Sequence, residues 1–313
     1  MATCPVCKNK EVKLWGVAKD YEYFSSEKSY KYFECNRCHC LFIDPIPADE
    51  LKLIYPKNYY SFIPRKKNLF TSIKEWLDKK EFKKILRKIK SPQIRVLDIG
   101  GGTGWLLDII KNIDKRVVLT QIVDIDQDAG KSAIAKGHCY YEGKLEDFNT
   151  NTRYDFILML NLIEHVENPL AILQKVSAFL EEKGLVLIKT PNIESWDARL
   201  FKKKYWGGLH CPRHWVIFSA SSFRKILEDT NLMINSLTYT QGGPFWAFSL
   251  LAWLHRKGWI ALDAQRPLVC HPLYPYISGI TALFDFVRRP FAKTSQMFIV
   301  LEKKDNLSTH GSR

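Results

Sequence analysis

Residues 96–104 read VLDIGGGTG, an apolar run that stops at an acid and then breaks into glycines. The run predicts a buried parallel strand over residues 94–99, and the apolar residues after the glycines predict a helix that begins at Trp105. Gly100, Gly102 and Gly104 let the backbone turn tightly and approach a ligand that a Cβ atom would repel. The order of strand, glycine turn and helix predicts an α/β sheet with a ligand site at its carboxyl edge.

A second apolar run, over residues 117–123, ends at Asp124. An acid at the end of the next strand, about twenty residues beyond such a loop, is placed to accept hydrogen bonds from two ribose hydroxyls. The loop is spaced G-x-G-x-G, whereas dinucleotide sites use G-x-G-x-x-G; Asp98 precedes it, and it has no P-loop lysine. These features predict a nucleoside site.

The chain resembles the class I S-adenosylmethionine-dependent methyltransferases in three segments that occur in this order: VLDIGGGTG, IVDIDQ and YDFILMLNLIEHVENP. The resemblance covers nearly the whole chain and is closest to a bacterial branch, often encoded with sugar and surface-glycan pathways, that is similar to ubiquinone methyltransferases and carries a zinc ribbon. It implies a Rossmann-like, mostly parallel sheet with an antiparallel last strand. It also implies that the glycines admit the amino-acid end and sulfonium of the cofactor, and that Asp98 orients the loop or the ammonium group.

One stretch departs from the family pattern. After the third strand many relatives have Gly-Asp-Ala, with the Asp on the adenine amino group, whereas residues 143–147 read GKLED here. We expect the backbone of Leu145 or the carboxylate of Glu146 to take that place, and Asn161 completes the expected cofactor set. The ubiquinone-type relatives hold a divalent ion with an acid-rich version of residues 161–165; Asn161 replaces one of the acids, so a metal is less expected there.

Five of the eight cysteines lie in the first 40 residues, which contain no apolar run of signal-peptide length. We therefore expect a cytoplasmic protein, where crowded cysteines indicate a metal before a disulfide. Two C-x-x-C pairs flank a strand-like segment and predict a structural Zn²⁺ site made by Cys4, Cys7, Cys35 and Cys38. His39 and Cys40 are also within reach, which leaves the fourth ligand open. Unrelated buried cysteines are the alternative.

Methyl transfer is an in-line displacement at carbon for which the protein supplies alignment and usually a base. His165 follows the strand predicted over residues 154–160, and its imidazole could take a proton from a hydroxyl nucleophile. The structural alternative, which we weigh equally, is that Glu164 and His165 only cap and pack the next helix.

After the strand predicted over residues 185–188, the segment 205–215 reads YWGGLHCPRHW. It offers His210 and His214 as further catalytic candidates. We expect a mobile loop that covers the substrate, with Trp206 in contact and Arg213 available for a carboxylate or phosphate; a packed capping loop is the alternative. A Tyr pair typical of the branch adds Tyr59 and Tyr60 as substrate contacts.

The predicted organisation has six parts. They are a zinc-ribbon module (residues 1–45), a connector with docking or lid helices (46–92), the methyltransferase core (93–243), an aromatic helical insert (244–293), the last core strand (294–304) and a disordered tail (305–313). Proline and basic residues interrupt the apolar runs of the insert, so neither run is long enough for a membrane span. The pattern predicts two amphipathic helices instead. They could wall the substrate pocket, pair with another subunit or lie on a membrane.

The leading interpretation is a methyltransferase that acts on a hydroxyl of a sugar, glycan or lipid-linked intermediate, with a carbon of the same acceptors as the second choice. The formal charge of +14 fits phosphate-bearing partners or an anionic membrane surface, and fits solvated lysines equally well. An rRNA or tRNA methyltransferase is the alternative, although NLIEH stands where amino-group enzymes have Asn-Pro-Pro-Tyr. A non-catalytic cofactor-binding scaffold is the third interpretation. The oligomeric state stays open.

Overall fold

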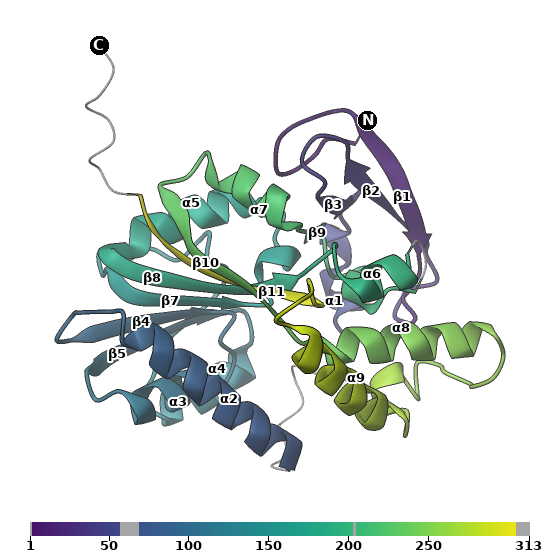
Figure 1. The fold of residues 1–313 in the computed structure, drawn as a ribbon. Coiled ribbons are helices and arrows are strands. Elements are labelled where there is room, and N and C mark those ends of the chain that lie inside the picture. The colour runs from purple at the N-terminus through teal and green to yellow at the C-terminus, as the bar shows by residue number, and fades with distance from the viewer. Residues whose placement is uncertain (1, 57–68, 203–204, 305–313) are drawn as a thin grey trace.

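The computed structural model describes residues 2–56, 69–202 and 205–304, and two sheets organise it (Figure 1). Tyr59, Tyr60 and the tail 305–313, for which the sequence made predictions, lie outside these residues. The larger sheet has seven strands in the order β10-β11-β8-β7-β4-β5-β6. Its strands are β4 (Ile94–Ile99), β5 (Val117–Asp124), β6 (Cys139–Glu142), β7 (Tyr154–Leu160), β8 (Leu180–Pro191), β10 (Leu232–Thr240) and β11 (Gln296–Lys303).

The sheet is parallel from β8 through β7, β4 and β5 to β6. Strand β11 runs antiparallel to β8, and β10 runs antiparallel to β11. The predicted mostly parallel sheet with an antiparallel last strand is confirmed. Its parallel strands all end at one edge, which is where open α/β sheets place their ligands.

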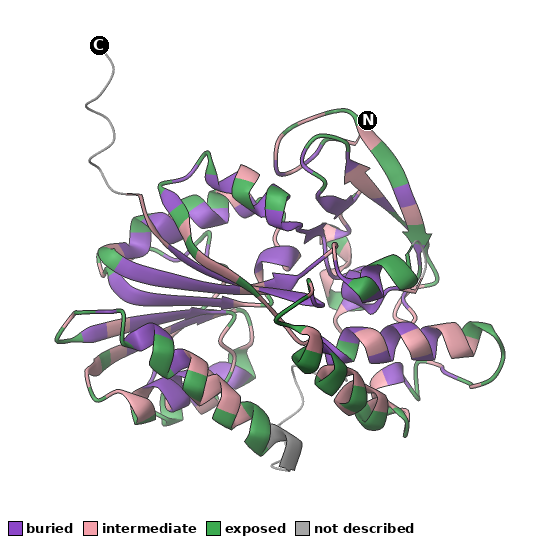
Figure 2. Ribbon diagram, in the orientation of Figure 1, coloured by how far each residue is buried: buried purple, intermediate pink, exposed green. Residues whose placement is uncertain are grey.

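Helices cover both faces of this sheet and bury its apolar strands (Figures 1 and 2). One face packs against α2 (Leu69–Leu86), α3 (Trp105–Ile113) and α4 (Gln127–Ala135). The other packs against α5 (Pro169–Phe179) and α7 (Ala220–Leu227). Side chains of β7 alternate between the two cores: Phe156 and Leu158 face α2 and α3, whereas Ile157 and Met159 face α5 and α7.

The smaller sheet is antiparallel and has four strands in the order β1-β2-β3-β9. The first three come from the N-terminal region: β1 (Val12–Ala18), β2 (Tyr30–Cys35) and β3 (Leu41–Ile43). The fourth, β9 (Val216–Ile217), comes from the segment after β8 and pairs with β3 in the register Leu41 opposite Ile217. The N-terminal region therefore shares one sheet with the segment that carries the candidate histidines.

The insert forms two helices, α8 (Gly243–Arg256) and α9 (Tyr274–Arg288), that pack on each other. The short helices α1 (Leu51–Ile54) and α6 (Trp196–Leu200) lie between the two sheets and the insert (Figure 1). Within the residues described, no helix is long and apolar enough to cross a membrane.

Candidate functional site

The glycine loop joins β4 to α3 and has left-handed backbone at two positions that matter for a ligand. Gly102 has a φ of +51°, and a Cβ atom added there would meet nothing within 4 Å, so open space lies beside this residue. Gly104 has a φ of +74°, and a Cβ atom there would lie 2.6 Å from the His138 ring. The first glycine leaves room for a ligand and the second allows the helix to pack closely.

Two acids lie against this loop. Asp98 is 2% exposed, and its Oδ2 finds no hydrogen-bond partner in the described part of the chain. Burial, and then the nearby charge of Asp124, raises the pKa of Asp98 to about 7. A buried carboxylate oxygen without a partner beside open backbone fits a ligand ammonium group, as the resemblance implied.

Asp124 is already engaged with the loop. Its Oδ2 accepts a hydrogen bond from the Gly102 amide at 2.8 Å, and its Oδ1 accepts one from the Asp126 amide at 3.0 Å. Each carboxylate oxygen keeps a second lone pair for a ribose hydroxyl. Asp124 therefore fixes the loop and can still take the predicted role.

The remaining cofactor candidates differ in exposure. Leu145 is buried in the core, whereas the Glu146 side chain is exposed. Asn161 is exposed at the end of β7, has a φ of +54°, and its Oδ1 accepts a hydrogen bond from Gln296 Nε2 at 2.9 Å. The next residue, Leu162, contacts the loop: a Cβ atom on Gly100 would lie 3.3 Å from its side chain. The segment after β7 is therefore adjacent to the cofactor loop, and the individual cofactor roles stay predictions.

Three histidines gather beyond Leu162, although two of them are more than forty residues away in the sequence. The ring centroid of His165 lies 4.7 Å from that of His214 and 6.2 Å from that of His210. His165 Nδ1 lies 3.0 Å from the Arg213 carbonyl oxygen and 3.0 Å from the Tyr55 hydroxyl. Because a carbonyl only accepts, the network assigns the proton to Nδ1 and leaves Nε2 as the proton acceptor.

Burial dominates the chemistry of this cluster. It lowers the pKa of His165 to about 3, with a further lowering from His210, so the imidazole is neutral at physiological pH. Glu164 is fully buried, and burial raises its pKa to about 8. Its Oε2 accepts a hydrogen bond from the Thr190 hydroxyl at 2.9 Å, and its Oε1 lies 3.9 Å from His214 Nε2.

Ligand atoms of Glu164, His165 and His214 lie within 4.8 Å of one another. His214 Nδ1 donates to the Gly208 carbonyl oxygen at 2.7 Å, which leaves its Nε2 as an acceptor. The chemistry of these three groups is compatible with a divalent ion.

The comparisons with known proteins agree with this geometry. A model of the methyltransferase domain matches residues 64–237, which is more than half of the chain. The chain belongs to this methyltransferase family. Its core accordingly has the class I fold, and S-adenosylmethionine is the methyl donor of the class.

Curated relatives are distant. The chain is 27% identical over 168 residues to a ubiquinone biosynthesis O-methyltransferase of Bradyrhizobium diazoefficiens. The matched region covers 49% of this chain and 63% of that protein. It is 30% identical over 175 residues to the protein of the same name from Bradyrhizobium sp. (strain ORS 278), covering 50% of this chain and 66% of that protein. The matched region thus spans less than two thirds of either relative.

A solved structure of coclaurine N-methyltransferase, bound to N-methylheliamine and SAH, superposes with a TM-score of 0.50. The superposition covers 82% of this chain and 81% of that one, at 16% identity. This likeness shows the fold alone.

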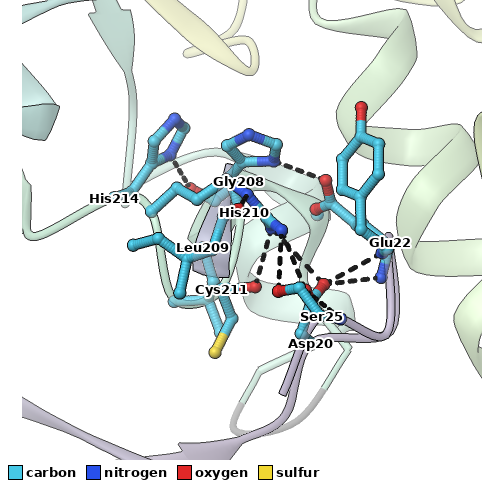
Figure 3. A network of polar contacts seen from close by, with 12 residues as sticks. Asp20, Glu22, Ser25, Gly208, Leu209, His210, Cys211 and His214 are labelled. Carbon is cyan, nitrogen blue, oxygen red and sulfur yellow. Dashed lines mark hydrogen bonds and ion pairs between the residues drawn. The ribbon is translucent and has the colours of Figure 1, made fainter. Parts of the chain in front are cut away.

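The N-terminal region of the methyltransferase contributes two acids to the histidine cluster (Figure 3). Glu22 hydrogen-bonds His210 Nδ1 through its Oε2, and both side chains are buried. Asp20 pairs with the fully buried guanidinium of Arg213 at 2.8 Å, and this guanidinium also donates to the Cys211 carbonyl oxygen at 3.2 Å. Neither acid was predicted, because nothing in the sequence pairs residues nearly 190 positions apart.

The segment 205–215 is packed rather than open. Trp206 is 2% exposed and donates to Asp197 Oδ2 at 2.8 Å. Arg213 is 0% exposed. The structure thus places these two predicted substrate residues inside the protein, with internal partners, and their contact with a substrate stays a prediction. His210 and His214 lie beside His165 in the cluster, and their catalytic roles stay predictions. Tyr55 was missed.

The four predicted zinc ligands converge at one end of the smaller sheet. The sulfur atoms of Cys4, Cys7, Cys35 and Cys38 lie within 4.8 Å of one another. The Sγ atoms are 3.5 Å apart in the pairs Cys4–Cys38 and Cys7–Cys35. Zinc–sulfur bonds of about 2.3 Å in a tetrahedron put sulfurs about 3.8 Å apart, so the four thiols fit Zn²⁺.

His39 and Cys40, the two further candidates for the fourth zinc ligand, lie in different surroundings. The His39 ring is exposed and its Nδ1 lies 3.7 Å from Glu34 Oε1. Cys40 is buried, and its Sγ lies 3.5 Å from that of Cys4. A fifth thiol thus borders the cluster, and His39 faces away toward Glu34.

Proposed function

We propose that this methyltransferase moves the methyl group of S-adenosylmethionine to a hydroxyl oxygen of a sugar, glycan or lipid-linked acceptor. A carbon acceptor is the less favoured form of the same proposal. The supporting observation is the position of the His165 imidazole: the Arg213 carbonyl oxygen orients it through Nδ1, Nε2 is left as the acceptor, and the segment that carries it contacts the cofactor loop at Gly100. A hydroxyl must lose its proton during transfer, and an amine or thioether acceptor would not need a base in the same way.

The cofactor supplies an electrophilic methyl group on a sulfonium. The residues of the chain would do the rest: Asp98 would hold the ammonium group, Asp124 would hold the ribose hydroxyls, and His165 Nε2 would accept the proton of the acceptor hydroxyl. Transfer would give the methyl ether of the acceptor, the thioether form of the cofactor and a protonated imidazole, so charge and atoms balance. The Arg213 carbonyl fixes the tautomer of His165 from the other side of the ring.

The acceptor class rests on two supports. The distant relatives are named for O-methylation, which favours oxygen. The basic composition favours an acceptor that carries phosphate, as nucleotide sugars and lipid-linked intermediates do. In the alternative of an rRNA or tRNA acceptor, the same positive charge and the zinc module would bind the RNA.

The test is transfer of a labelled methyl group. Purified protein is incubated with methyl-labelled S-adenosylmethionine and a host extract separated into sugar-nucleotide, lipid, RNA and protein fractions, with Asp124→Ala as the control that cannot hold the cofactor. Label in the sugar or lipid fraction, absent with the control, supports the proposal. Label in RNA overturns it in favour of the nucleic-acid alternative, and cofactor binding without transfer to any fraction favours a scaffold.

A further inference from the structure

Helix α9 exposes most of its large apolar side chains to solvent. Near the start of α9, Tyr274 and Ile277 pack on the apolar cluster that includes Phe248 of α8. Beyond them, small or polar residues of α9 make the contact with the N-terminal end of α8. A Cβ atom on Gly243 of α8 would lie 2.2 Å from the Ser278 carbonyl oxygen and 3.0 Å from Ala282 Cβ, so the two helices approach closely there. Thr281 Oγ1 donates to the Gly243 carbonyl oxygen at 3.3 Å. The inner side of α9 is thus fixed by close backbone contact.

A buried acid fixes the same side. Asp285 is 0% exposed and accepts hydrogen bonds from the Gly242 amide at 3.0 Å and from the Ser295 hydroxyl at 2.8 Å. Its Oδ1 also pairs with Arg288 at 2.8 Å. Asp285 is the only acid among residues 271–293, so this stretch exposes no negative charge to solvent.

The outward side of α9 is apolar. Tyr276, Ile280, Leu283 and Val287 are exposed and recur every three or four residues, the spacing of one helix face. Leu273, Phe284 and Phe286 are exposed beside them. Ile280 and Tyr276 are each 70% exposed. Phe291, just after the helix, is 90% exposed. The exposed stretch stands at the rim of the molecule in Figure 2.

Helix α6 extends this apolar face and adds positive charge beside it. The Trp196 ring centroid lies 6.4 Å from that of Phe284, and Trp196 is 54% exposed. Leu200 on the same short helix is 69% exposed. Exposed basic residues flank the face, namely Arg199, Lys202, Arg289 and Lys293, of which Lys293 pairs with Glu194 at 2.7 Å.

We propose that this α9–α6 face binds the surface of an anionic phospholipid bilayer, with α9 lying in the plane of the interface. Aromatic and aliphatic side chains flanked by arginine and lysine, with no exposed acid on α9, complement acyl chains and phosphate headgroups. At 15 residues the helix is about 22 Å long, short of the roughly 30 Å hydrocarbon core, so an in-plane position suits it.

A second copy of the chain is the competing occupant. A helix face about 22 Å long and about 10 Å wide is small beside the roughly 800 Å² that each partner buries in a stable interface. The flanking arginines and lysines would also repel their own copies in a symmetric pair. Both considerations favour lipid. The proposal does not depend on the identity of the methyl acceptor.

The experiment is vesicle flotation with the full-length protein. Phosphatidylcholine vesicles are compared with mixed phosphatidylcholine–phosphatidylglycerol vesicles, for the wild type, for the double variant Ile280→Glu/Leu283→Glu, and for Ile134→Glu. Ile134 is an exposed apolar residue of α4, 59% exposed, and provides the matched control. Cofactor binding and circular dichroism verify that each variant is folded.

We expect the wild type and Ile134→Glu to float with the anionic vesicles, and the double variant to bind them on the order of 100-fold more weakly. Arg289→Glu should weaken binding about fivefold, and added salt should do the same. Wild-type protein that stays with the bottom fraction in both vesicle types overturns the proposal, as does equal flotation of the double variant. A concentration-dependent dimer that the double variant abolishes, without vesicle binding, assigns the face to a second copy instead.

Discussion

The guanidinium of Arg213 and the carboxylate of Asp20 form a buried ion pair of 2.8 Å between residues 193 positions apart in the sequence. The pair ties the segment that carries His210 and His214 to the loop after β1. The Asp20 carboxylate also accepts hydrogen bonds from the backbone amides of Glu22 and Tyr23, so it shapes the loop that presents Glu22. One ion pair therefore orders both sides of the histidine cluster.

Removing the charge of Asp20 should be costly. We expect Asp20→Asn to lower the free energy of unfolding by about 3–5 kcal/mol, because Arg213 is then a buried charge without its partner. Urea unfolding measures this difference. Asp128→Asn, which breaks the exposed pair with Lys131, is the control and should leave the midpoint unchanged. A loss below about 1 kcal/mol for Asp20→Asn would contradict a structural role for the pair.

Zinc removal should disturb the histidine cluster through the shared sheet. Strand β3 lies just beyond Cys38 and pairs with β9, so we expect an N-terminal module without metal to hold the segment 205–218 less firmly. We expect dialysis against a strong chelator to release zinc, to reduce turnover strongly and to leave cofactor affinity within a few fold of the starting value.

Metal analysis, isothermal titration with S-adenosylhomocysteine, and turnover together check this prediction. Cys139→Ser is the control, since Cys139 is exposed and far from the cluster in sequence. Full turnover after complete loss of zinc would show that the module is independent of the site.

Cofactor affinity should depend on Asp98. Its pKa is raised to about 7 before a ligand binds, and only the ionised form attracts an ammonium group. Because the ligand favours the carboxylate, binding releases a proton, and affinity should fall about tenfold for each pH unit below 7. Titration of S-adenosylhomocysteine between about pH 5.5 and pH 8.5 measures the slope. Asp98→Asn should bind more weakly at high pH and with a flat profile; an unchanged slope in that variant would exclude Asp98 as the source.

His165 should affect transfer and not binding. We expect His165→Asn to keep cofactor affinity and to lower kcat by about 10²–10⁴-fold, the usual contribution of a general base. Since the pKa of His165 is about 3, its own titration should not appear in the wild-type rate profile above about pH 5. His271→Asn is the matched control, because His271 is remote from His165 in sequence and lies between α8 and α9. Normal turnover of His165→Asn would leave the histidine with only its packing role.

Short sequence patterns were sufficient to predict the strands and the glycine loop of the methyltransferase core. The glycine loop, the acid at the end of β5 and the apolar runs of β4 and β7 each carry their signal within a few residues, and the predicted strands and the two insert helices appear at those positions. Strand lengths were less accurate: β8 extends over Leu180–Pro191, beyond the predicted residues 185–188, because its charged beginning hides the pairing.

The site could be predicted only in part, because half of it depends on contacts between distant segments. His165, His210 and His214 were chosen one by one from residue type and position, yet the sequence could not show that their rings meet. Asp20, Glu22 and Tyr55 have no pattern that marks them, since each acts through a partner more than a hundred positions away. Asp20 and Glu22 leave one trace in the sequence, which is that they are charged residues beside a run of aromatic residues.

The pairing of β3 with β9 limits how this architecture can change during evolution. Val216 and Ile217 are fully buried, and they complete a sheet whose other strands come from the start of the chain. Recombination that removed or exchanged the cysteine-bearing module would leave β9 without its partner strand β3. Val216 and Ile217 would then be exposed, with unpaired backbone groups. We therefore expect the module and residues 205–218 to be inherited as one unit.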